Sequence, residues 1–202
     1  MLIEINKEAP EYPKLKQAVE IMKQGGVIAY PTDTIYGLGC DALNADAIQK
    51  IYKIKQKPVS EGLSFIVPDL KDIAKYAIVP DTAYRIIKML TPGPYTFVLK
   101  ATKLIPKQIL PKRLTVGIRI PDSPVCLELT KMLGNPIVST SANISGEPYF
   151  TDPIEIEKQL DGNLDLILAS GILKDEPSTV IDLTQEQPVL LRQGKGDVSK
   201  IL

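Results

Sequence analysis

Histidine is absent from the 202 residues of this chain, and its absence removes several kinds of chemistry. Serine or cysteine nucleophiles activated by histidine are excluded, as are acid–base catalysis by imidazole and metal sites with histidine ligands. A reaction at this protein must therefore use lysine, arginine, hydroxyls, carboxylates or backbone amides, or a metal that arrives with a substrate. We expect no metal site built by the protein alone.

Cysteine, net charge and long apolar runs are also scarce. The two cysteines, Cys40 and Cys126, are too few and too far apart for a disulfide framework or a zinc ribbon, which favours a reducing, cytoplasmic location. No apolar run reaches the ~18 residues that span a bilayer, and the first residues lack signal-peptide features, so we expect no membrane association. With 24 basic and 24 acidic side chains, the chain is unlike proteins that depend on non-specific phosphate contacts.

Hydrophobic spacing predicts a single α/β domain over residues 1–202. Residues 15–22 have helical spacing before Gly25-Gly26, and Asn44 is suited to cap a second helix whose apolar stripe starts at Ile48. Strands and helices alternate without a repeat or a linker, so we expect a twisted mixed sheet flanked by helices. Further helices are expected around Ile73, around Ile86, over 124–133 and from Pro153; strands are expected at 1–5, 27–30, 63–67, 95–100, 116–120, 137–138, 166–168, 179–183 and 189–191.

A polar turn over residues 31–39, Pro-Thr-Asp-Thr-Ile-Tyr-Gly-Leu-Gly, follows a buried strand. Open α/β sheets bind ligands where strands end, and the two glycines would let a ligand approach closely. An ordinary strand-to-helix turn is the alternative interpretation. Spacing alone does not separate the two.

Basic residues occur in two different settings. Lys53, Lys55 and Lys57 leave the second helix just before Pro58, where they would neutralise a triphosphate or form a solvated helix face. Arg119 lies inside an apolar strand, where burial is costly unless an internal carboxylate or a ligand anion pairs with it. Arg192 raises the same question.

Small polar residues cluster at 139–143, Ser-Thr-Ser-Ala-Asn, after an apolar strand. Such residues donate to phosphate or carboxylate groups, or else they cap the next turn. The chain has no phosphate-binding P-loop, dinucleotide glycine fingerprint or kinase signature, so each segment alone indicates little.

In this order, the segments together resemble the YrdC-like family of threonylcarbamoyl-adenylate synthases over nearly the whole chain. The final stretch, from Ser178 to Leu202, resembles the YciO branch most. The resemblance implies a concave, twisted mixed sheet with a ligand cavity, flanked by helices, without the extra C-terminal domain of longer members. It rests on residues 26–38, 55–58, 91–94, 117–121, 139–146 and 178–183.

The activity implied by the resemblance is that of a nucleotidyltransferase, an L-threonylcarbamoyladenylate synthase for tRNA threonylcarbamoyladenosine. Threonine and bicarbonate form a carbamate, whose oxygen attacks the α-phosphorus of ATP and expels pyrophosphate. Mg²⁺ is expected to arrive with ATP. Further implied partners are tRNA or double-stranded RNA and the threonylcarbamoyl-transfer proteins.

Individual positions match the family motifs. Those that match threonine contacts are Thr34, Arg119, Ser139 and Ser178, and those that match ATP contacts are Lys55, Lys57, Thr115, Ser141, Asn143 and Arg192. Of these, the resemblance gives Lys55, Lys57 and Arg119 the catalytic role, because they would align two anions and neutralise their charge.

Three positions depart from the family pattern. Lys57 replaces an arginine, and lysine lacks the planar fork that binds phosphate in a bidentate manner. Glu61 replaces a neutral Asn, and Ile66 replaces a histidine found in some members. Two alternatives therefore stand beside the synthase. One is carbamoyl transfer to another acceptor; the other is a non-catalytic double-stranded RNA- or nucleotide-binding protein, supported by Lys103, Lys107, Lys112 and Arg113 but not by the three Phe and no Trp available for stacking.

Overall fold

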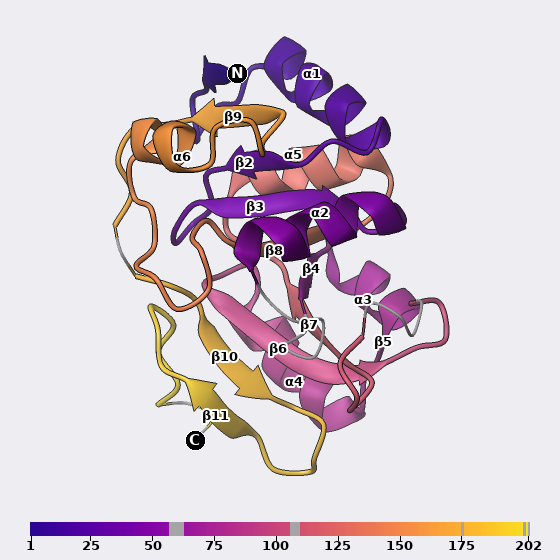
Figure 1. Ribbon diagram of the computed structural model, residues 1–202. Helices are drawn as coiled ribbons and strands as arrows, with labels where there is room; N and C mark the ends of the chain where they lie inside the picture. Colours follow the sequence, from indigo (N-terminus) through magenta and orange to yellow (C-terminus); the bar gives the residue numbers. More distant parts are fainter. Residues whose placement is uncertain (57–62, 106–109, 175, 200, 202) are drawn as a thin grey trace.

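The computed structural model describes residues 1–56, 63–105, 110–174, 176–199 and 201 (Figure 1). Within these ranges, eleven strands form one mixed sheet in the order β1-β9-β2-β3-β8-β4-β7-β6-β10-β11, and β5 pairs with β6. The strands are β1 (Leu2–Glu4), β2 (Ile28–Tyr30), β3 (Gly37–Asp41), β4 (Ser64–Ile66), β5 (Ala77–Ile78), β6 (Tyr95–Ala101), β7 (Thr115–Arg119), β8 (Ile137–Ser141), β9 (Leu166–Ala169), β10 (Thr179–Asp182) and β11 (Val189–Arg192).

Helices cover parts of both faces of this sheet, and Figure 1 shows α2 and α5 on opposite faces. None of the helices in the described ranges is long and apolar enough to cross a bilayer. The helices are α1 (Tyr12–Lys23), α2 (Ala45–Lys55), α3 (Leu70–Tyr76), α4 (Asp81–Leu90), α5 (Pro124–Leu133) and α6 (Pro153–Gln159).

Helix ends follow the signals in the sequence. The Asn44 side chain accepts a hydrogen bond from the Ala47 N–H, 2.9 Å away, at the start of α2. Asp152 caps α6 in the same way, through the N–H of Ile154. After α1, Gly25 adopts a positive φ of 80°, a conformation that glycine takes at little cost. The helices that the sequence predicted are all present, and the predicted mixed sheet is confirmed.

Three strands differ from the sequence-based expectation, and one of them is the short β5 (Ala77–Ile78), where no strand was expected. Residues 37–41 form β3 in the middle of the sheet, although the pattern at 31–39 indicated a turn. Strand β8 continues through Ser139 and Ser141, although these residues were expected to follow the strand. The differences at β3 and β8 have one cause, because glycine and serine are poor strand formers and their strand conformation here depends on neighbours in the sheet.

The core consists of two apolar clusters on opposite faces of the sheet. One contains residues of α2, α3, α4 and α6 together with Leu38, Phe65 and Phe97 of the strands. The other contains α1 and α5 residues packed on Tyr30, Ile66 and Ile137. We call the second one the α1/α5 cluster. It covers only part of its sheet face, and the uncovered part forms the site described next.

Candidate functional site

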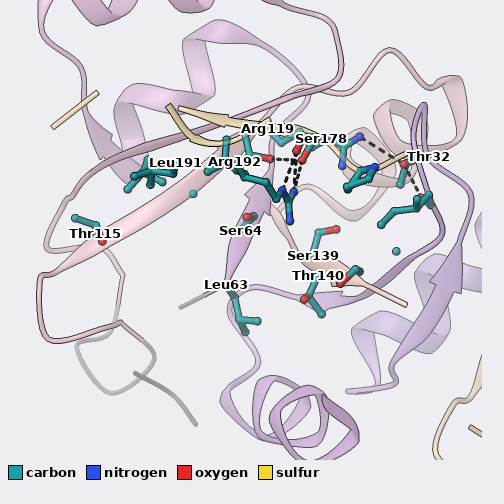
Figure 2. Close-up of a pocket in the computed structure, with 18 of the residues that line it drawn as sticks. Thr32, Leu63, Ser64, Thr115, Arg119, Ser139, Thr140, Ser178, Leu191 and Arg192 are labelled. Atoms are coloured by element: carbon teal, nitrogen blue, oxygen red, sulfur yellow. Dashed lines mark hydrogen bonds between the residues drawn. The ribbon is translucent and has the colours of Figure 1, made fainter. Parts of the chain in front are cut away.

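A cavity of about 380 Å³ lies on the sheet face that α1 and α5 leave uncovered (Figure 2). Side chains alternate across a strand, so Ser64, Gly117 and Ser139 face the cavity while Phe65, Ile118 and Val138 enter the core behind. The volume is within the range of small-molecule sites, roughly 300–1,000 Å³. Further lining residues include Thr32, Gly37, Thr96, Thr115, Arg119, Thr140, Ser141, Ser178, Leu191 and Arg192.

Small residues create the space at the floor of the cavity. A Cβ added at Gly117 would lie 2.6 Å from the Ser64 Oγ and 3.2 Å from the Thr96 Cγ2. These three residues are on adjacent strands, because β4 pairs with β7 and β7 pairs with β6. A larger side chain at this point would fill the hollow.

Arg119 is paired with an internal carboxylate and still has a donor to spare. Its Nη2 donates to Asp33 Oδ1 at 2.5 Å and to Thr34 Oγ1 at 2.8 Å. The Asp33 carboxylate also accepts the Asp122 N–H at 3.1 Å, which ties the turn at 31–36 to the end of β7. The buried Arg119 Nε has no hydrogen-bond partner among the described residues. A buried donor without a partner is costly, so the neighbouring protein groups satisfy the Arg119 guanidinium only in part.

Thr34 belongs to the same hydrogen-bond network but lines a different hollow. A second cavity of about 350 Å³ borders Thr34, Asp33 and Lys195, and shares Thr32 with the main cavity. The Lys195 Nζ donates to the Asp33 carbonyl at 2.7 Å. The turn at 31–36 therefore separates the two hollows, and Thr34 is connected to the main cavity through Arg119.

Ser178 and Arg192 meet at the opposite side of the main cavity. The Arg192 Nε and Nη2 donate to the Ser178 carbonyl at 3.1 and 2.8 Å, and Nη2 is 3.2 Å from the Ser178 Oγ. Thr96 Oγ1 lies 3.0 Å from the same hydroxyl. Thr115, at the start of β7, also borders the cavity (Figure 2). Arg192 is exposed, so its charge at the rim is accessible to an anion.

Lys55 reaches the cavity wall from behind. It is only 2% exposed, and its Nζ donates to the Ser141 carbonyl at 2.9 Å, to the Ser141 Oγ at 3.3 Å and to Asn143 Oδ1. Ser141 lines the cavity, whereas Lys55 and Asn143 are not among the lining residues. The buried ammonium thus organises the loop after β8. Lys57 and Glu61 lie outside the described residues.

Several residues of the site were not singled out from the sequence. Ser64 and Thr96 line the cavity, and Asp33 holds Arg119. The strand alternation carries a signal for Ser64 and Thr96, because each is a hydroxyl residue at a strand end with apolar neighbours. Ile66, in contrast, is fully buried in the α1/α5 cluster and is not among the lining residues.

Metal ligands are not gathered in this part of the molecule. The described residues contain no group of three or more Cys, Asp or Glu side chains that could hold a metal ion. The described lining of the main cavity includes hydroxyls and two arginines but no carboxylate. Such a lining suits an anionic ligand.

The Sua5/YciO/YrdC family model, described as "Telomere recombination", matches residues 20–194. The chain belongs to this family. The Escherichia coli protein YciO is 42% identical over 200 residues, which cover 98% of this chain and 97% of that protein. The crystal structure of E. coli YciO superposes with a TM-score of 0.95 at 41% identity, covering 100% of this chain and 99% of that one.

Relatives named threonylcarbamoyl-AMP synthase or Sua5 are also similar to this chain. The Vibrio vulnificus threonylcarbamoyl-AMP synthase is 36% identical over 184 residues, which cover 89% of this chain and 98% of that protein. The structure of Pyrococcus abyssi Sua5 complexed with L-threonine has a TM-score of 0.89 at 32% identity. It covers 96% of this chain, which spans 57% of that longer protein.

Proposed function

We propose that this protein is an L-threonylcarbamoyladenylate synthase, which forms threonylcarbamoyl-AMP and pyrophosphate from L-threonine, bicarbonate and ATP for tRNA modification. The observation that carries the proposal is Arg119 at the wall of a cavity whose described lining offers hydroxyls and no carboxylate. An arginine fork binds carboxylates in a planar, bidentate manner. Arg119 would hold the threonine carboxylate, as in the arrangement expected for family members that bind this amino acid.

The remaining residues of the cavity suit the nucleotide. In the proposed complex, Arg192 at the rim meets a phosphate, and Ser141 and Thr115 donate from the walls. Lys55 donates hydrogen bonds to Ser141 and Asn143 from behind the cavity wall. It would therefore hold the loop after β8 in place and bring its positive charge close to the bound nucleotide. Lys57 belongs to the same proposed set.

The reaction needs two anions held side by side. The carbamate of threonine carries the attacking oxygen, the α-phosphorus of ATP receives it, and pyrophosphate leaves with the electron pair of the broken P–O bond. Mg²⁺ bound to the phosphates would neutralise the leaving group, and the cavity lining does not need to supply carboxylates for it. Arg119 and Arg192 would offset the charge of the reactants, and alignment would supply much of the rate.

A direct assay tests the proposal. Purified protein is incubated with ATP, L-threonine and labelled bicarbonate, and pyrophosphate and labelled adenylate are measured. We expect threonine-dependent product, reduced by about 100- to 1,000-fold in Arg119→Lys, which keeps a charge beside Asp33 but lacks the fork. Arg85→Ala is the matched control, because Arg85 is exposed on α4, away from the cavity.

A different result in the same assay would contradict the synthase. Absence of threonine-dependent pyrophosphate, together with tight binding of double-stranded RNA, would favour the non-catalytic alternative. Lys103, Lys112 and Arg113 are exposed, and Pro111 beside them lines the cavity, so their removal would then weaken RNA binding. Lys107 lies outside the described residues.

A further inference from the structure

Tyr30 reaches the cavity wall from a strand that does not border it. The side chain starts on β2, and its hydroxyl donates to the Ser139 Oγ, 2.7 Å away on β8. Strand β3 lies between these two strands in the sheet. Tyr30 is 0% exposed, so the donor side of this hydrogen bond is shielded from water.

Two glycines of β3 make this passage possible. A Cβ added at Gly39 would lie 2.7 Å from the Tyr30 Cε1, and one at Gly37 would lie 3.2 Å from the Tyr30 Cζ. Real Cβ atoms do not approach ring carbons as closely as the first of these values. Gly39 therefore leaves room for the tyrosine ring under β3. The sequence pattern suggested that this glycine admits a ligand, and the structure assigns the space to Tyr30.

The hydrogen bond decides what Ser139 can offer to a ligand. A serine hydroxyl has one proton to donate and two lone pairs, and Tyr30 occupies one lone pair. Among the described residues, the Ser139 hydroxyl donates no hydrogen bond, and Ser139 lines the main cavity. Donation by Tyr30 also polarises the serine O–H and makes it a stronger donor.

Burial also keeps the Tyr30 hydroxyl protonated. Burial raises the pKa of the Tyr30 hydroxyl far above its usual value, and the hydrogen bond to Ser139 only partly opposes this rise. The phenol therefore keeps its proton at neutral pH and well above it.

We propose that Tyr30 is a positioning residue that turns the Ser139 proton into the cavity, so that Ser139 selects an anionic oxygen of the ligand. This inference rests on the proposed function for the identity of the ligand, the carboxylate or carbamate of L-threonine. The positioning itself follows from the contacts of Tyr30 and Ser139 alone.

The first experiment is a double-mutant cycle on L-threonine binding, measured by calorimetry. Tyr30→Phe removes only the hydroxyl and should weaken binding by about 3- to 10-fold, the usual range for one hydrogen bond. In a Ser139→Ala background, Tyr30→Phe should have no further effect, because the group through which it acts is gone. Tyr52→Phe is the matched control, since this buried phenol has no hydrogen-bond partner among the described residues and does not line the cavity.

Independent, additive losses in the cycle would overturn the inference, and so would unchanged binding in Tyr30→Phe. If the wild-type protein does not bind L-threonine, the proposed function fails instead. A second experiment then still tests the positioning, because it needs no ligand.

That second experiment uses Ser139→Cys and measures the rate of thiol modification by a neutral reagent at fixed pH. A hydrogen bond from Tyr30 to the introduced sulfur would stabilise the thiolate, so adding Tyr30→Phe should slow modification several-fold. The native thiols give little background, because Cys40 and Cys126 are 0% exposed and burial raises the pKa of each to about 12. Equal rates with and without the phenol would contradict the inference.

Discussion

Strands β4 and β8 carry two different surfaces on the same side of the sheet. Ile66 and Ile137 are buried in the α1/α5 cluster, whereas Ser64 and Ser139, two positions away on the same strands, line the cavity. We call the part under α1 and α5 the covered half and the cavity-lining part the open half. Both halves lie on the same strands, in the same register and on the same face of the sheet. What differs is the helix cover, and the side chains change from aliphatic to hydroxyl where this cover ends. One half stabilises the fold and the other remains available to a ligand.

Arg119 and Tyr30 lie where the two halves meet. Arg119 pairs with Ile66 in the β4–β7 register and lines the cavity. Tyr30 belongs to the α1/α5 cluster, and its hydroxyl reaches Ser139 in the open half. Substitutions on either side of this boundary should therefore have different consequences.

The largest effect on stability is expected in the covered half. Leu129 of α5 is 0% exposed within the α1/α5 cluster, so Leu129→Ala should lower the free energy of unfolding by about 2–5 kcal/mol through lost burial and a cavity. Urea denaturation measures this difference. Leu43→Ala is the control, because Leu43 is 58% exposed, and a similar loss there would contradict the assignment of the core.

At the boundary, Asp33→Asn should cost less. The substitution keeps an oxygen for the Asp122 N–H but removes the charge that balances Arg119, which we expect to cost about 1–3 kcal/mol. Threonine binding should weaken as well, because the guanidinium would lose its anchor. Denaturation and calorimetry separate these two effects. Asp122→Asn should change stability by only ~0.5 kcal/mol, since the Asp122 contact comes from the backbone.

In the open half, Gly117→Ala should impair binding more than folding. The added methyl group points at the Ser64 Oγ and occupies the cavity floor, so we expect L-threonine affinity to fall by about tenfold, or about 1.4 kcal/mol. Calorimetry measures the affinity. Adding Ser64→Gly should restore part of it by returning the space, and full affinity in Gly117→Ala alone would mean that the ligand does not use this floor.

The smallest effect concerns the edge of the covered half, before α1. The pKa of Glu11 is lowered to about 2, chiefly by the hydrogen bond from Lys14 and also by the Asn6 N–H. A folded-state pKa below the ordinary 4.5 stabilises the protein above pH 4.5, and this contribution disappears as the pH falls from 4.5 towards 2. Glu11→Gln should flatten the decline of the melting temperature over this interval. Lys14→Met should flatten it similarly, and an unchanged decline in both variants would show that the pair is unimportant.

Much of the fold was predictable because its signals are local. The burial stripe of α1, the Asn44 cap and the span of α5 follow from spacing and from residue types that act within a few positions. The membership of the family was equally predictable, because the matching blocks run through the chain in order. The strand β3 was not predicted, since its glycines disfavour a strand in isolation and fit here only because the Tyr30 ring lies against them.

Part of the cavity lining was predictable from the sequence, but the contacts between the lining residues were not. The sequence left open whether an internal carboxylate or a ligand satisfies Arg119, and the structure brings Asp33 to one nitrogen while Nε has no partner among the described residues. Lys55, which the sequence placed at the phosphates, contacts Ser141 and Asn143 from behind the wall, a connection that the sequence did not indicate. Such contacts join residues far apart along the chain, for which local patterns carry no information.

Residue order alone was sufficient for the helices, for most of the strands, for the exclusion of histidine chemistry and for the family. Alternation along each strand also shows which residues share a face. It does not show which half of that face a helix will cover, because the cover comes from α1 and α5, elements distant in the sequence that pack together only in the folded chain. Tertiary packing therefore decided that Ile66 is core, that Ser64 is cavity, and that the Tyr30 hydroxyl reaches Ser139 from two strands away.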